Sequence, residues 1–135
     1  MKWAAIRSAL VKRIQDEDFE LPILWESKEG RSGVAHLRFW FMPASTEPST
    51  TGPTGRDLAE GIAQIDVMYP PGDGVGNALE KADEIAAGFQ AGLRLEYDGQ
   101  DVIVRGSEIS PAMNEDGWLM VAVSVRWSAY IRRSL

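Results

Sequence analysis

The sequence has 135 residues, no cysteine and a formal net charge of −6 at pH 7. This length suits one domain, expected over residues 1–135, whose core forms without disulfides or thiolate-bound metal. The acidic balance argues against direct binding to nucleic acid, because affinity for phosphates requires clustered lysine and arginine.

The N-terminal segment and the hydropathy of the chain bear on its localisation. Residues 1–10 lack the unbroken apolar run of a secretory signal, so we expect a protein that is not secreted. No stretch of the sequence approaches the roughly 18 apolar residues that a membrane span needs. We therefore expect a soluble protein with no membrane partner.

The first quarter of the chain predicts one helix and then extended segments. Apolar residues recur at spacings of three and four from Trp3 to Ile14, which predicts an amphipathic helix that ends near the acidic residues 16–18. We expect a short extended piece at 21–26, since proline at position 22 keeps its predecessor out of helical space. A polar turn at 28–33 then leads into an aromatic-rich strand at 34–42.

The composition changes abruptly after this strand. Residues 43–57 are rich in proline, glycine, serine and threonine and contain almost no apolar side chain. Such a segment cannot bury enough apolar surface to offset the entropy of ordering its backbone. The sequence therefore predicts a flexible loop at about 44–57, disordered in the free subunit and ordered on assembly.

The second half predicts a strand, a helix and then only strands. Alternating residues predict a strand at 58–69, which Pro70-Pro71-Gly72 ends. A helix is expected at 75–93, followed by strands at 94–97, 101–109 and 118–131. The predicted buried stripe of this helix is Val75, Leu79, Ala82, Ile85, Ala86 and Phe89. This order predicts an α+β fold, with a mixed, mostly antiparallel sheet of about four to five strands and two helices packed on one face.

Three features could suggest catalysis, and each has a simpler explanation. The glycine-rich segment 72–76 lacks the spacing of a dinucleotide-binding loop and the lysine of a P-loop, so we interpret it as a turn that Asp73 helps to cap. His36 is the only histidine and has no motif around it, and the carboxylates at 16–20 are typical of a solvated helix end. We expect no catalytic, metal-binding or cofactor-binding residue and no enzymatic activity.

The strands themselves carry the more informative pattern. In the last strand, Leu119 to Ala129 alternate as an apolar face, and the opposite parity holds tryptophan, methionine, arginine and tyrosine. Because two helices cover only one face of a sheet, the second face has the composition of a protein interface. The predicted interface, including the end of the adjoining loop, consists of Arg38, Trp40, Met42, Arg56, Asp57, Met68, Trp118 and Arg126.

In the order and spacing of its segments, the chain resembles the tail terminator, or tail-completion, proteins of long-tailed, siphovirus-type bacteriophages and prophages. The resemblance covers nearly the whole sequence and contains no catalytic signature. It rests on ILWES at 23–27, HLRFWFMPA at 36–44, GIAQIDVMYPPGDG at 61–74, ALEKADEIAAGF at 78–89 and the long closing strand.

This resemblance implies a structural role in the virion. The chain would form a homo-oligomeric ring, a hexamer, on the last ring of major tail tube protein. The ring would end tube polymerisation and present the surface to which a head-completion or neck protein attaches. Assembly would take place in the cytoplasm of the bacterial host, and the mature protein would lie at the neck end of the tail. No cofactor is implied.

Other classes remain open from the sequence. A head–tail connector or a tube-like subunit is the nearest alternative. A small-molecule-binding module comes next, and an enzyme last.

Overall fold

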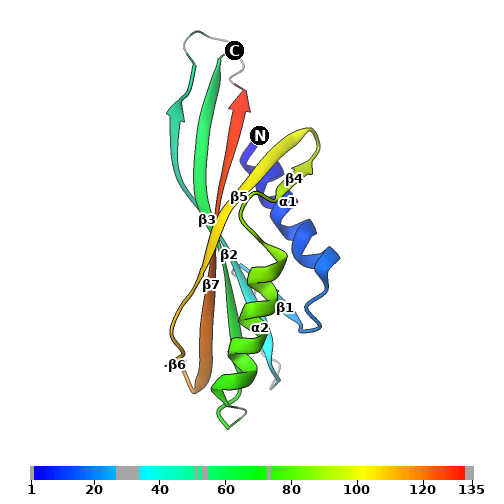
Figure 1. Cartoon of the computed structure of the whole chain (residues 1–135), viewed down its shortest axis with the longest axis vertical. Helices are drawn as coiled ribbons and strands as arrows, with labels where there is room; N and C mark the ends of the chain where they lie inside the picture. Colours follow the sequence, from blue (N-terminus) through cyan, green and yellow to red (C-terminus); the bar gives the residue numbers. More distant parts are fainter. Residues whose placement is uncertain (1, 27–33, 51, 53–54, 73, 133–135) are drawn as a thin grey trace.

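The computed structural model describes residues 2–26, 34–50, 52, 55–72 and 74–132. The chain forms two helices, α1 (Lys2–Glu17) and α2 (Val75–Gly88), and a sheet of seven strands (Figure 1). The strands are β1 (Ile23–Trp25), β2 (His36–Pro48), β3 (Arg56–Tyr69), β4 (Arg94–Tyr97), β5 (Gln100–Ile109), β6 (Met113–Glu115) and β7 (Trp118–Arg132). The predicted turn at 28–33 and the capping role of Asp73 lie outside the described residues.

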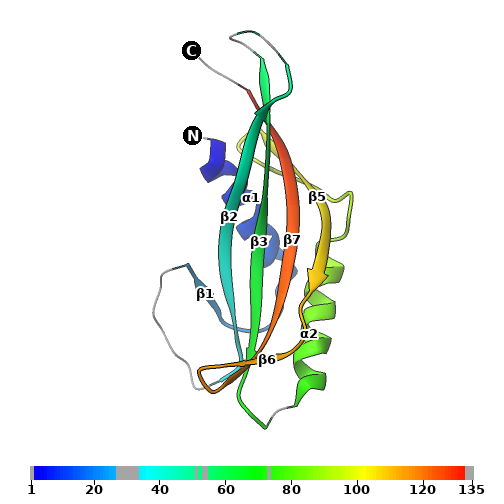
Figure 2. The ribbon, with the colours of Figure 1, turned by 90° about the vertical axis from the view of Figure 1, so that its left-hand side faces the viewer.

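The sheet has the order β1-β2-β3-β7-β5-β4, and β6 also pairs with β7. β1 runs parallel to β2, and every other pair is antiparallel. Both helices lie on one side of the curved sheet, here called the inner face, and leave the outer face free of helices (Figure 2). The α+β prediction with two helices on one face is confirmed. The predicted count of about four to five strands is too low, because the short segments β1 and β4 both join the sheet and β6 was not predicted.

The inner face holds the hydrophobic core, as the alternation in the last strand predicts. Val121, Val123 and Val125 of β7 are fully buried against apolar residues of both helices. Their packing removes water from contiguous apolar surface, which is the main favourable contribution to folding. The helix residues in this core include Ile6, Leu10 and Ile14 from α1 and Ala78, Ala82 and Ile85 from α2.

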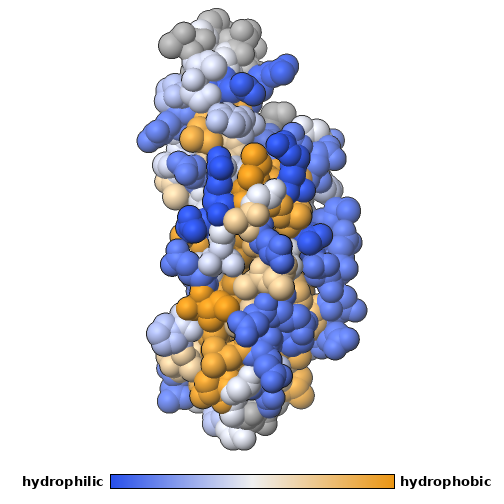
Figure 3. Space-filling model, viewed as in Figure 1, coloured by the Kyte–Doolittle hydropathy of each residue, from blue (hydrophilic) through white to orange (hydrophobic). Residues whose placement is uncertain are grey.

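The buried stripe of α2 differs from the prediction at its start. Val75 and Leu79 are 46% and 38% exposed, and the helix ends at Gly88 instead of residue 93. Small side chains at Ala78 and Ala82 form the contact with the sheet, so Val75 and Leu79 stay at its margin. Figure 3 shows apolar surface gathered at this end of the molecule, over β6 and the start of α2.

The predicted loop at 44–57 is wrong at its two sides, because residues 44–48 and 56–57 pair as strands. β2 and β3 continue in register through Glu47↔Leu58 and Pro48↔Asp57, and β7 extends beside them as far as Arg132↔Arg56. We call this projection the arm (residues 44–48, 56–60 and 128–132; top of Figure 1). Pairing on both sides of β3 overrides the weak strand propensity of the arm's composition. Residues 51, 53 and 54 lie outside the described residues.

The free edge of β2 beyond β1 is blocked by side chains and prolines. A carboxylate oxygen of Glu26 accepts a hydrogen bond from the Phe41 backbone N–H at 3.2 Å, and Arg7 binds the same carboxylate. Further along the strand, Pro43 and Pro48 have no N–H to donate. The edge therefore offers few of the donors that another strand would need.

The arm joins the core at a close contact between Gly61 of β3 and Trp127 of β7. These residues are cross-strand partners, and a Cβ atom on Gly61 would lie 2.5 Å from the indole ring and 2.6 Å from the Met42 carbonyl oxygen. Because no side chain fits there, glycine lets the Trp127 ring lie flat against the sheet.

We expect Gly61→Ala to lower the free energy of unfolding by about 2–3 kcal/mol, since overpacking forces Trp127 or the backbone to move. Urea unfolding followed by circular dichroism measures this. Gly76→Ala is the matched control: its Cβ meets nothing within 4 Å in α2, and helix propensity should raise stability by up to about 1 kcal/mol. Equal effects of the two substitutions would contradict the packing argument.

Candidate functional site

The outer face is a ladder of cross-strand rows that span β2, β3 and β7. Each row takes one residue from each strand, and all three side chains point away from the helices. From the β6 end toward the arm, the rows are His36–Met68–Met120, Arg38–Asp66–Ala122, Trp40–Gln64–Ser124 and Met42–Ile62–Arg126.

The first row is covered by the hairpin of β6 and β7, which curls over the outer face (Figure 2). Trp118 packs edge-on against His36, with ring centroids 4.9 Å apart, and His36 and Met68 are only 4% and 2% exposed. The prediction that Met68 lies on an exposed interface is therefore wrong, and His36 beside it is buried in the same way. Strand parity alone does not show that a second layer covers this end of the sheet.

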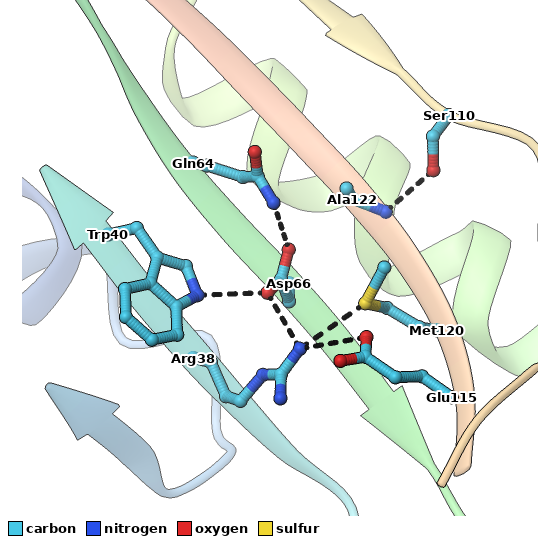
Figure 4. Close-up of polar contacts among 8 residues, drawn as sticks. All are labelled: Arg38, Trp40, Gln64, Asp66, Ser110, Glu115, Met120 and Ala122. Carbon is cyan, nitrogen blue, oxygen red and sulfur yellow. Dashed lines mark hydrogen bonds and ion pairs between the residues drawn. The ribbon is translucent and has the colours of Figure 1, made fainter. Parts of the chain in front are cut away.

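The second row contains a buried carboxylate. Asp66 is 1% exposed and accepts hydrogen bonds from Arg38 Nη2 at 3.0 Å, Trp40 Nε1 at 3.0 Å and Gln64 Nε2 at 2.7 Å (Figure 4). A buried charge needs such partners, because desolvation otherwise makes it very unfavourable. Asp66 thus fixes the side chains of two predicted interface residues, Arg38 and Trp40.

Arg38 links this row to the covering hairpin. Its Nη2 donates to Glu115 Oε2 of β6 at 3.1 Å and approaches the Met120 sulfur at 3.4 Å (Figure 4). Glu115 lies just before the predicted strand at 118–131, and its contact with Arg38 of β2 depends on how the β6–β7 hairpin curls. The Arg38–Glu115 contact holds the hairpin against the sheet.

The third and fourth rows emerge from beneath the hairpin. Trp40 and Met42 are 38% and 39% exposed, and the exposed Arg126 Nε lies 3.3 Å from Glu108 Oε1. We call the side chains of these two rows the outer patch: Trp40, Met42, Ile62, Gln64, Ser124 and Arg126. The patch combines two exposed apolar anchors with polar groups at its margin.

The other two predicted interface residues lie apart from this patch, in the arm. Arg56 stacks over the Tyr130 ring, with its guanidinium carbon 5.0 Å from the centroid, and Asp57 pairs with Ile131 across the strands. The structure thus brings Arg38 and Trp40 together at Asp66, places Met68 and Trp118 at the covered first row, and leaves Met42 and Arg126 in the exposed fourth row. Asp66 itself was missed as a site residue, although its outer-face parity was readable from the sequence.

Among the described residues, no group of three or more His, Asp or Glu side chains could hold a metal ion. The glycine-rich segment leads into α2 with Gly74 at the N-cap position. Of the helices in the described ranges, neither is long and apolar enough to cross a membrane.

We expect Asp66→Asn to lower the free energy of unfolding by about 2–4 kcal/mol, because it leaves the partly buried Arg38 without its main counter-charge. Chemical unfolding of the purified variant measures this. Glu115→Gln removes the more exposed partner of Arg38, whose side chain is 43% exposed, and should cost no more than about 1 kcal/mol. Two equal losses would show that Asp66 does not organise this row.

Comparison with known proteins agrees with this architecture. A solved structure shares the fold with a TM-score of 0.74 and 27% sequence identity, over 92% of this chain and 92% of that chain. No match to the sequence is found among curated proteins.

The family comparison covers nearly the whole chain. Residues 5–127 match the family described as phage tail terminator protein. The matched range includes α2, most of α1, the outer patch and the β2 and β3 sides of the arm. The chain therefore belongs to the phage tail terminator family and is a structural protein of the phage tail.

Proposed function

We propose that this chain caps the phage tail tube as a homo-oligomeric ring of six copies, ends tube polymerisation and provides the surface for head attachment. The observation that carries the proposal is the family match over residues 5–127. The outer patch, a helix-free surface with exposed apolar anchors, adds physical support.

The outer patch has the make-up of a contact surface. Trp40 and Met42 are large, exposed and adjacent on one strand, and tryptophan and methionine are enriched at protein interfaces. The hydrogen bond from Trp40 to Asp66 holds the indole in one orientation before a partner binds. Binding therefore requires little further ordering of this side chain, which favours affinity.

The proposed partners are a second copy of this chain, the major tail tube protein and a head-completion or neck protein. A single contact of about 1,600 Å² gains from such anchors but loses rigid-body freedom, so we propose weak association in solution. On the end of a tube several contacts form together, which strengthens binding through effective concentration. The ring would assemble in the host cytoplasm and remain at the neck end of the virion tail.

The proposed activity is assembly, not catalysis. The polar groups of the outer face bond to one another around a buried carboxylate, which suits a fixed surface. A tube-like subunit would stack on itself without limit, whereas a terminator adds one ring and stops. Tail length is the property that separates these two roles.

We expect Met42→Asp to abolish tail capping while the protein stays folded, because Met42 is 39% exposed and the substitution places a charge in the outer patch. Circular dichroism measures folding, and electron microscopy of tails assembled with the variant measures their length distribution. Met68→Asp is unsuitable for this test, since Met68 is buried and the variant should misfold.

Leu79→Asp is the matched control. Leu79 is 38% exposed but lies on α2, on the inner-face side of the molecule. Normal tails with folded Met42→Asp would show that the outer patch is not the contact. If Leu79→Asp gives overlong tails and Met42→Asp does not, the contact surface lies on the helix side of the molecule.

A further inference from the structure

A groove lies on the outer face where the arm meets the hairpin of β4 and β5. Its volume is about 550 Å³, and its walls include Arg56, Tyr130 and Arg132 from the arm and Arg94 and Asp101 from the hairpin. β7 pairs with β5 only as far as Ser128↔Ile103, so the strands diverge beyond this point and leave the groove between them.

The groove carries positive charge that the chain itself leaves incompletely neutralised. Arg94 lies 3.6 Å from Asp101, whereas Arg56 and Arg132 make no ion pair with any described residue. Asp98 is a second carboxylate in the lining, so the groove holds three arginines against two aspartates. This excess stands out on a chain whose formal net charge is −6.

The opposite edge of the arm carries a carboxylate at the same level. Glu47 of β2 pairs with Leu58 of β3, and Leu58 pairs with Tyr130 of β7. Glu47 and Tyr130 therefore lie in one cross-strand row, on the same face and at the two edges of the arm. Glu47 is exposed and forms no ion pair within the part of the chain that the structure describes.

We propose that the groove receives the Glu47 edge of β2 from the next copy of this chain, with Glu47 placed among Arg56, Arg94 and Arg132. This inference rests on the proposed ring and identifies one of its contacts. In a cyclic assembly, one surface of each copy binds a different surface of the next copy. The Glu47 edge of β2 and the groove at the β7 edge are two such surfaces, since they lie at the same level, on the same face, and carry opposite charge.

The contact is made by side chains and does not continue the sheet. Pro43 and Pro48 remove backbone donors from β2, and the Gln100 side-chain amide already donates to the Tyr130 carbonyl oxygen at 3.0 Å. Both edges are therefore restricted as hydrogen-bonding partners for another strand. The contact therefore depends mainly on the attraction between Glu47 and the arginines of the groove, and it should weaken as the salt concentration rises.

The test uses charge reversal in two separate full-length proteins. Glu47→Arg should prevent the β2 edge from binding the groove, and Arg132→Glu should prevent the groove from binding Glu47. For each variant alone, the apparent dissociation constant of ring formation should rise about tenfold or more over that of wild type. A 1:1 mixture should recover to near the wild-type level, because every contact in an alternating ring then pairs opposite charges. Sedimentation velocity and electron microscopy of tails measure ring formation, and circular dichroism measures folding.

Controls use reversals away from the groove. Glu80→Arg on the exposed side of α2 matches Glu47→Arg, and Lys12→Glu on α1 matches Arg132→Glu; both should leave ring formation unchanged. A misfolded variant would not regain activity on mixing with another defective variant, so recovery is specific to the paired charges.

The outcomes separate this contact from the ring itself. If the Glu47→Arg variant forms rings as readily as wild type, the proposed contact is wrong and the proposed function still stands. Failure of the 1:1 mixture to recover also overturns it. Binding of short duplex DNA that Arg132→Glu abolishes, with rings unaffected, would assign the groove to phosphate instead. Wild-type protein that forms no ring, in solution or on tails, overturns the proposed function and this contact together.

Discussion

The close approach of Trp127 to the backbone of Gly61 determines how the rest of the molecule is arranged. The Trp127 ring stacks on Phe41, with centroids 5.5 Å apart, and meets Trp3 of α1 edge-on at 5.9 Å. One side chain therefore connects α1 and β2 to the middle of the sheet. Its Nε1 has no acceptor among the described residues, so its packing must outweigh an unsatisfied donor that costs about 1–3 kcal/mol.

This contact divides the chain into two parts with different physical character. On one side, the helices and the covering β6–β7 hairpin bury both faces of the sheet, and Asp66 is enclosed with its three donors. On the other side, only the base of the arm belongs to the core, through Ala59 and Ala129, and strand pairing holds the exposed remainder. The outer patch lies at the boundary, where a rigid sheet holds exposed side chains.

Periodicity in the sequence identifies which residues share a face, and it does so well for β7 and α1. It does not give strand register, so Arg38, Asp66 and Glu115 cannot be brought together from the sequence alone. Composition misled the prediction at 44–57, since serine, threonine and proline are typical of loops but are tolerated in a strand paired along its length. Met68 was misassigned because parity gives a direction and not the presence of a covering layer.

The protected edge of β2 has a consequence for the free subunit. A long exposed strand usually serves as a template on which other chains add, which leads to cross-β aggregates. Here the Glu26 carboxylate occupies one donor, and prolines remove two others along the same strand. The β2 edge is therefore a poor template for strand addition, which lowers the tendency of free subunits to aggregate through this edge.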